Sequence, residues 1–321
     1  MTKLIDRLRI PLRNIETHRL QQKVKAAKLV RSQVQYNSTP EVTVILQFFN
    51  KRRNIKPILK NLRLSGVEEI IVIDDGSVDG SYQEWLKYLD QPNDFLLHCN
   101  DLYEVRTYDR AISMARGKYV CLLQDDDLPP PDPSWIKNAV TLFENFPKLL
   151  LLGGREGVDI LIPESADSTL GSQYKQVGNI HEWTGFCKYQ LCDQPIHSDP
   201  ISGIPFMFTM TVNRAPVFLR REAFISIGGI NQKYAPYQCD DVDSSIQAWL
   251  QGFEVGLYSC GFQRGLGQQG MKLYNSQTRG QVMGRNWQTI YEQYYEVIAS
   301  GYLETLVKHA NQVLSPATNR K

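Results

Sequence analysis

The fold is decided by residues 42–77, which read VTVILQFFNKRRNIKPILKNLRLSGVEEIIVIDDGS. The stretch opens with β-branched and apolar residues over 42–46, a run that predicts a strand buried on both faces. Apolar residues then recur at helical spacing over 55–62, and a second β-branched run over 69–73 leads into the polar residues 74–77. A strand, a helix and another strand in this order predict two parallel strands joined by a crossover helix.

The same alternation continues along the chain. Strands are predicted over 95–97, 118–123, 149–152, 206–212, 217–219 and 254–258. Helices are predicted over 81–89, 103–115 and 134–146, before Gly228-Gly229, from near Asp240 and from near Asn286. Residues 157–200 show little periodicity and are expected to be irregular. The fold class is therefore α/β, with a mostly parallel central sheet and helices on both faces.

Composition narrows the class of protein. The chain has 321 residues, of which 42% are apolar, and its net charge of +2 gives no basic field for nucleic acid. The six cysteines form no C-x-x-C pair and no zinc spacing, as expected for free thiols in a reducing compartment. No apolar run approaches the roughly 20 residues that span a bilayer, and the N-terminus lacks the pattern of a secretory signal. We therefore expect a cytoplasmic protein.

The first 40 residues differ from the rest. They carry nine Lys and Arg against Asp6 and Glu16, and residues 14–34 have the spacing of a basic amphipathic helix. Two interpretations stay open. The arm either packs on the catalytic body or, through residues 1–36, contacts the anionic cytoplasmic face of a membrane as a peripheral anchor.

The candidate site residues lie in three acidic clusters. These are Asp74-Asp75 after the second strand, residues 125–127 after the fourth strand, and residues 240–243 at the start of a late helix. Ligands bind beyond the carboxyl ends of parallel strands, so the first two clusters should meet at one edge of the sheet. Acids in these places also cap helices, and capping remains the alternative for Asp74-Asp75 and for Asp240-Asp241. Three adjacent carboxylates repel one another without a cation, so residues 125–127 predict a site for Mg²⁺ or Mn²⁺.

Several motifs occur in order between Val42 and Gly256: VILQFFN (44–50), VIDDGSVDG (72–80), ARGKYV (115–120) with LQDDD (123–127), FLRREAF (218–224) and DDVD (240–243). With this set the chain resembles the family 2 inverting glycosyltransferases of the GT-A fold, a Rossmann-like fold of nucleotide-diphospho-sugar transferases. The expected organisation is a helical arm (1–40), a catalytic domain (41–285) with a nucleotide-binding half (41–153) and an acceptor half (154–285), and a C-terminal helical extension (286–321).

The resemblance also implies roles for single residues. Those expected to bind the nucleotide sugar are Gln47, Phe49, Asp75 and Asp125, with Phe49 against the base and Asp75 hydrogen-bonded to it. Asp126 and Asp127 are the implied ligands of Mn²⁺ or Mg²⁺, and Asp241 is the implied general base. The chain departs from the family pattern in three places. Gln124 replaces a frequent Asp, Asp109 stands where Asn is usual, and residues 261–272 contain no metal-ligating His, for which Gln268, Gln269 or water would substitute.

The implied function is transfer of a sugar from a nucleotide-diphosphate sugar, with a UDP-sugar favoured, to a glycan, lipid-linked or protein acceptor. A metal would stabilise charge on the departing diphosphate, and one carboxylate suffices to deprotonate the attacking hydroxyl. Two alternatives are kept. A metal-dependent nucleotidyltransferase would need a phosphate cradle, and no G-x-x-x-x-G-K-[ST] occurs. A catalytically inactive nucleotide-sugar-binding protein would account for Gln124 and the missing His.

Overall fold

The computed structural model describes residues 18–19, 21–22, 39–161, 174–180, 183–191, 197–214, 216–263, 266 and 276–316. The chain divides into two compact units, Met1–Thr39 and Pro40–Lys321. In the first unit His18, Arg19, Gln21 and Gln22 are helical, and the Gln22 amide lies 3.0 Å from Nε2 of His18. Most of the predicted arm lies outside the described residues, so its role stays a prediction. Within the described ranges, no helix is long and apolar enough to cross a membrane.

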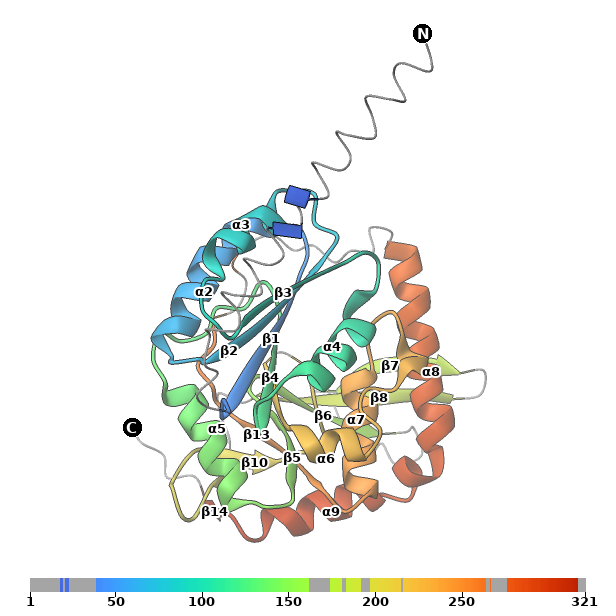
Figure 1. Ribbon diagram of the computed structural model, residues 1–321. Coiled ribbons are helices and arrows are strands. Elements are labelled where there is room, and N and C mark those ends of the chain that lie inside the picture. Colours follow the sequence, from blue (N-terminus) through green and yellow to red (C-terminus); the bar gives the residue numbers. More distant parts are fainter. Residues whose placement is uncertain are drawn as a thin grey trace. The chain divides into compact units, whose positions relative to one another are not determined.

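The second unit is built on an eight-stranded sheet with the order β10-β13-β5-β12-β4-β1-β2-β3 (Figure 1). Its strands are β1 (Val42–Phe48), β2 (Glu69–Asp75), β3 (Asp94–Cys99), β4 (Tyr119–Leu123), β5 (Leu149–Gly153), β10 (Phe206–Phe208), β12 (Val217–Arg220) and β13 (Glu254–Tyr258). Four neighbouring strands, β3, β2, β1 and β4, run parallel to one another, and β13 runs parallel to β5. Only β10 and β12 are antiparallel to their neighbours in this sheet. The predicted α/β class with a mostly parallel sheet is confirmed.

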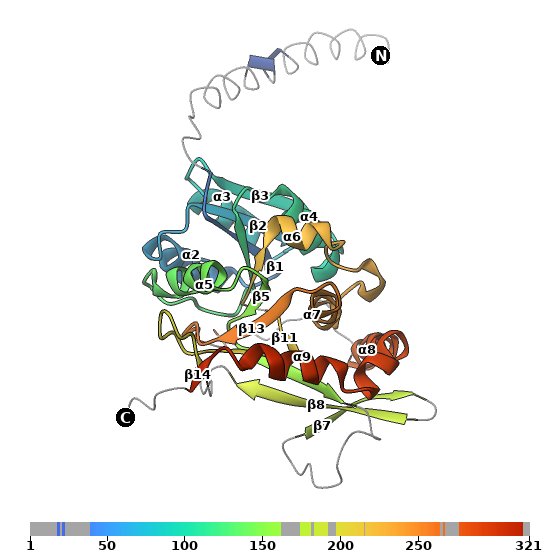
Figure 2. The ribbon, with the colours of Figure 1, turned by 90° about the horizontal axis from the view of Figure 1, so that it is seen from below.

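Helices cover both faces of this sheet (Figures 1 and 2). They are α2 (Ile55–Leu64), α3 (Ser81–Tyr88), α4 (Tyr103–Met114), α5 (Ser134–Asn145), α6 (Arg221–Ser226) and α7 (Asp240–Leu250). On one side, Nε1 of Trp135 in α5 donates to Oγ of Ser65 at the end of α2, over 2.9 Å. On the other side, Nε of Arg221 in α6 donates to the Ile112 carbonyl of α4, over 3.0 Å. Two covered faces explain why the central strands are continuous apolar runs.

A second sheet corrects the prediction of an irregular segment over 157–200. Its order is β11-β6-β8-β7, with β11 (Thr211–Val212), β6 (Glu156–Leu161), β8 (Trp183–Leu191) and β7 (Tyr174–Ile180), all antiparallel. Its strands contain glycine, lysine and glutamine among the apolar residues, so they lack the β-branched runs of a doubly covered sheet.

The strand predicted over 206–212 is also two strands. β10 pairs with β13 in the central sheet, whereas β11 pairs with β6 in the second sheet. The chain changes sheet at Thr209 and Met210, which are buried, and the Thr209 amide donates to the Val255 carbonyl over 3.0 Å. Because the residues on both sides of the crossing are buried, the segment FMFTMTV reads as one strand and the break is not visible in the sequence.

The last long helix begins earlier than predicted. Helix α8 spans Ser276–Ala299, not from near Asn286, and α9 (Tyr302–Asn311) follows it. Gly280 and Gly284 lie inside α8 with open space around them, and glycine lowers helix propensity by about 1 kcal/mol, which obscures the first turns. The short strand β14 (Ser315–Pro316) then pairs with β9 (His197–Ser198).

Candidate active site

The loop after β1 lies between two of the acidic clusters. Strand register sets Phe48 opposite Asp74 of β2 and Leu46 opposite Leu123 of β4, so these strands end at one edge of the sheet. The Phe49 amide donates to Oδ2 of Asp125 over 3.0 Å, and the Asn50 amide donates to Oγ of Ser77 over 3.0 Å. The prediction that the two clusters approach each other at this edge is consistent with these contacts.

Asp75, the predicted partner of the nucleotide base, is fully buried at the end of β2. Its Oδ1 accepts from the Leu102 amide and its Oδ2 from the Tyr103 amide, each over 3.0 Å. The carboxylate therefore fixes the first turn of α4. Direct contact with a base stays a prediction, as it does for Gln47 and Phe49, which are partly exposed at the end of β1.

Asp125 is held by a buried cation. Nζ of Lys51 lies 2.6 Å from Oδ1 of Asp125 and 3.4 Å from Oδ2 of Asp126, and only 5% of the Lys51 side chain is exposed. Burial raises the pKa of Asp125 to about 6, although Lys51 and the Phe49 amide oppose that rise. Asp125 therefore joins the loop after β1 to the end of β4, and its contact with the nucleotide sugar stays a prediction.

Within the acidic triplet, Asp126 is the residue best placed to hold a divalent cation. Its side chain is 32% exposed, whereas that of Asp127 is 4% exposed and its Oδ2 lies 3.7 Å from Nη1 of Arg155. No cluster of three or more His, Cys, Asp or Glu side chains suited to a metal ion occurs in the described part of the chain. Magnesium sites of this kind use one or two carboxylates and complete their shell with substrate phosphates and water. The residues present fit that arrangement, with Asp126 as the candidate ligand, and metal binding by Asp126 and Asp127 stays a prediction.

The acids of the third cluster, residues 240–243, differ in their burial. Asp240 and Asp243 are 2% and 3% exposed, whereas Asp241 is partly exposed. Oδ1 of Asp243 accepts from the hydroxyl groups of Tyr234, over 3.1 Å, and Tyr294, over 2.6 Å. Asp241 lies in the first turn of α7, where the helix dipole favours an anion. Asp241 is therefore the accessible carboxylate of this cluster.

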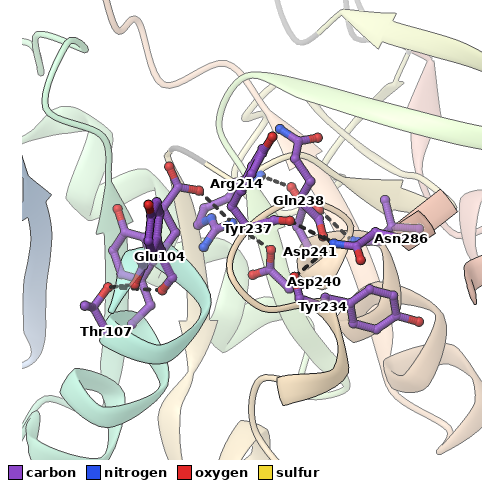
Figure 3. A network of polar contacts seen from close by, with 12 residues as sticks. Glu104, Thr107, Arg214, Tyr234, Tyr237, Gln238, Asp240, Asp241 and Asn286 are labelled. Carbon is purple, nitrogen blue, oxygen red and sulfur yellow. Dashed lines mark hydrogen bonds and ion pairs between the residues drawn. The ribbon is translucent and has the colours of Figure 1, made fainter. Parts of the chain in front are cut away.

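A buried arginine organises the start of α7 (Figure 3). Nη2 of Arg214 lies 2.7 Å from Oδ1 of Asp240 and 3.2 Å from Oε2 of Glu104 in α4. The backbone amide of Arg214 donates to Oδ2 of Asp241 over 2.8 Å, and the Val242 amide donates to Oδ1 over 2.9 Å. Burial raises the pKa of Asp240 to about 7 against the opposing effect of Arg214, and the charges of Asp241 and Glu104 add to that rise.

Tyr108 connects this network with the strand that precedes the acidic triplet. Its hydroxyl donates to the Leu123 carbonyl over 2.5 Å, and the guanidinium carbon of Arg214 lies 4.9 Å from the centre of its ring. The chain of contacts Leu123–Tyr108–Arg214–Asp240 therefore links the end of β4 with the start of α7. Asp109, the residue found where the family usually has Asn, accepts from the Ile230 amide over 3.0 Å.

The loop before α7 is strained and is held by α8. Gln238 and Cys239 have positive φ angles of 74° and 67°, a conformation that costs an L-residue roughly 1 kcal/mol. The fully buried Asn286 of α8 donates through Nδ2 to the carbonyls of Tyr234, Tyr237 and Gln238, over 2.8–3.0 Å (Figure 3). Helix α8 thereby contributes to the geometry of the predicted base.

Sequence reasoning missed four residues of this site: Lys51, Glu104, Arg214 and Asn286. Each acts through a partner far away in the sequence, and none stands in a motif of its own. The one signal was the position of Lys51, directly after the aromatic-Asn end of the first motif. Gln268 and Gln269 lie outside the described residues.

One comparison with known proteins finds a matching family. The model of glycosyl transferase family 2 matches residues 43–192, just under half of the chain. Residues 43–192 are therefore similar to glycosyl transferase family 2, and we call them the family 2 segment. This family 2 segment contains the end of β1, both acidic clusters at the sheet edge, and Glu104 and Tyr108. Arg214 and Asp241 follow it in the sequence.

Solved structures give weaker likenesses. S. aureus TarS 1–349 in complex with UDP-GlcNAc is 15% identical with a TM-score of 0.47, and covers 74% of this chain and 62% of that one. The complex of the same TarS fragment with UDP is 15% identical, has a TM-score of 0.45, and covers 68% of this chain and 58% of that one. A further S. aureus TarS structure is 16% identical and has a TM-score of 0.44. The likeness covers 68% of this chain and 35% of that one. The chain thus spans less than two thirds of each of these structures, and no curated protein matches it.

Proposed function

We propose that this protein is an inverting glycosyltransferase that moves a sugar from a nucleotide-diphosphate sugar to an acceptor hydroxyl. The match of residues 43–192 to glycosyl transferase family 2 supports the donor chemistry. The observation that carries the mechanism is the position of Asp241, the accessible acid of its cluster, whose two oxygens are oriented by the amides of Arg214 and Val242.

In this mechanism the acceptor hydroxyl attacks the anomeric carbon while the Asp241 carboxylate takes its proton. The new bond forms as the bond between the anomeric carbon and the diphosphate oxygen breaks, so the sugar inverts in a single displacement. A divalent cation, Mn²⁺ or Mg²⁺, would stabilise the negative charge of the departing diphosphate. Asp126 would hold that cation, while Asp125 and Lys51 keep the adjoining loop in place.

The donors that we propose to test first are UDP-sugars, in an assay for release of UDP with Mn²⁺ present. Asp241→Asn should lower kcat about 10²–10⁴-fold, because the base is lost, and should leave the Kd for UDP unchanged. Asp240→Asn is the matched control on the same helix turn and should cost much less. A severe loss in Asp240→Asn with a mild one in Asp241→Asn would move the base to Asp240. Equal turnover of Asp241→Asn and wild type would refute a base in this cluster.

We further propose that residues 1–36 contact an anionic membrane surface, where glycan, lipid-linked or protein acceptors would be met. The nine Lys and Arg of this region support the proposal, since each contributes about 1 kcal/mol near an anionic bilayer. Full-length protein should sediment with anionic liposomes at low salt and the deletion of residues 1–36 should not. Equal sedimentation of both proteins would contradict this role, and a lower Tm of the truncated protein without any liposome binding would make the arm structural.

A further inference from the structure

The burial of Arg214 is not explained by packing alone. Only 5% of its side chain is exposed, yet its Nε and Nη1 atoms have no hydrogen-bond partner within the described part of the chain. Arg221 shows the usual structural arrangement, because its guanidinium donates to the carbonyls of Ile112 and Ser113. A buried guanidinium with unsatisfied donors costs stability, and such a group calls for an explanation other than structural support.

The contacts of Arg214 are with acids. Its Nη2 lies within 3.2 Å of carboxylate oxygens of both Glu104 and Asp240, and its backbone amide donates to Asp241. One residue thus holds the two neighbouring acids of α7 in different ways, Asp240 through its side chain and Asp241 through its main chain. A substitution of the side chain leaves the backbone donor to Asp241 in place, so it changes the charge beside the base more than its position.

We infer that Arg214 and Glu104 are positioning residues that set the proton affinity of the Asp241 base, an inference that rests on the proposed function. The buried guanidinium of Arg214 pairs with Asp240 and Glu104 and also interacts electrostatically with Asp241. Glu104 brings an opposite charge from α4, across the junction between the family 2 segment and the rest of the site. Among other ionisable groups, Cys239 directly before α7 interacts electrostatically with Asp241, and the Tyr108 ring of α4 lies against Arg214.

The two residues predict shifts of opposite sign. A nearby cation lowers the pKa of a carboxylate and a nearby anion raises it, commonly by one unit or more. Because the base must be unprotonated, Arg214→Met should move the acidic limb of the kcat–pH profile upward by about one pH unit, and Glu104→Gln should move it downward. Arg214→Lys, which keeps the positive charge, should have a kcat–pH profile close to that of the wild type.

The experiment is the pH dependence of kcat and KM for the UDP-sugar that the wild type turns over fastest, with the Kd for UDP measured alongside. Arg221→Met is the matched control, because this arginine contacts α4 carbonyls and none of the site carboxylates, and its acidic limb should stay at the wild-type pH. Circular dichroism and Tm establish that each variant is folded, and Glu104→Gln keeps the test informative if Arg214→Met does not fold.

The inference is supported if the acidic limbs of Arg214→Met and Glu104→Gln shift in opposite directions while the Kd for UDP stays unchanged. Limbs that stay in place, or that shift in the same direction for Arg214→Met and Glu104→Gln, overturn it while leaving the proposed function intact. Wild-type protein that releases no UDP from any donor, or an Asp241→Asn variant with full turnover, would instead refute the proposed function.

Discussion

At the scale of single residues, burial separates acids that look alike in the sequence. Asp125 and Asp126 are neighbours, yet Asp125 is anchored by Lys51 and the Phe49 amide, whereas Asp126 keeps a third of its side chain exposed. Asp240 and Asp241 differ in the same way at the start of α7. The chemistry is therefore assigned by the environment of each carboxylate, and the following two predictions test that assignment.

Lys51→Met should destabilise the protein by roughly 3–5 kcal/mol, because it leaves the buried Asp125 carboxylate without its cation. Lys118→Met is the matched control, since Lys118 lies at the same 2.6 Å from Glu144 but both side chains are more than half exposed. The loss of that surface pair should cost about 0–1 kcal/mol. Urea denaturation of both variants measures the free energies of unfolding, and equal losses would show that Lys51 is not a buried counter-ion.

Asp126→Ala should weaken Mn²⁺-dependent binding of UDP at least tenfold and leave the metal-free Kd unchanged, because the diphosphate loses the cation that the carboxylate holds. Isothermal calorimetry with and without Mn²⁺ separates the two affinities. Asp132→Ala provides a surface control, since Asp132 lies in the exposed turn before α5. Unchanged Mn²⁺ dependence in Asp126→Ala would remove this residue from the metal site.

At the scale of elements, the C-terminal helix α8 matters to the site because Asn286 binds the strained loop that leads into α7. The loop must keep Gln238 and Cys239 in the left-handed region directly before the acids. We expect the loop to relax without the three carbonyl contacts and to displace Asp241.

Asn286→Ala should therefore lower both kcat and the free energy of unfolding, the latter by about 1–3 kcal/mol for buried carbonyls left unsatisfied. Asn311→Ala is the matched control, because the Asn311 side chain also binds backbone groups, at Phe208 and Val307, but serves α9 and β10. It should lose stability and keep kcat. If the two variants lose kcat to the same degree, the loop does not depend on α8 for its active geometry.

The elements also show which parts of the fold are readable in the sequence. Strands β1, β2, β4 and β5 were predictable because burial on both faces demands continuous apolar runs. The second sheet was missed because its strands mix polar residues and glycine with apolar ones. For the site, acids at strand ends were visible in the sequence. The roles of Lys51 and Arg214 were not visible, because their partners lie far away in the sequence. Asp125 lies 74 positions after Lys51, and Glu104 lies 110 positions before Arg214.

At the scale of the whole molecule, Arg214 and Tyr108 join the family 2 segment to the part of the site that follows it. The junction concentrates Glu104, Asp240 and Asp241 around a single buried cation, and the proton affinity of Asp240 responds to all of them. The stability of the folded protein should therefore depend on pH through this junction.

The direction of this pH dependence follows from the raised pKa of Asp240. The folded protein keeps this proton up to about pH 7, whereas the unfolded chain releases it near pH 4, so stability falls as the pH rises between these values. Between pH 5 and pH 8 the wild type should lose roughly 2 kcal/mol more than Asp240→Asn, which has no proton to release. Urea denaturation at both pH values measures this difference. Parallel pH dependence of the two proteins would show that Asp240 ionises normally.

Single displacement is tested most directly by the configuration of the sugar released from an α-linked UDP-sugar when water replaces the acceptor. Proton NMR recorded during the first minutes of hydrolysis distinguishes the two anomers before they equilibrate. Single displacement with Asp241 as the base predicts the β-anomer first, and Asp241→Asn should release it far more slowly. Initial release of the α-anomer would contradict an inverting mechanism at this site.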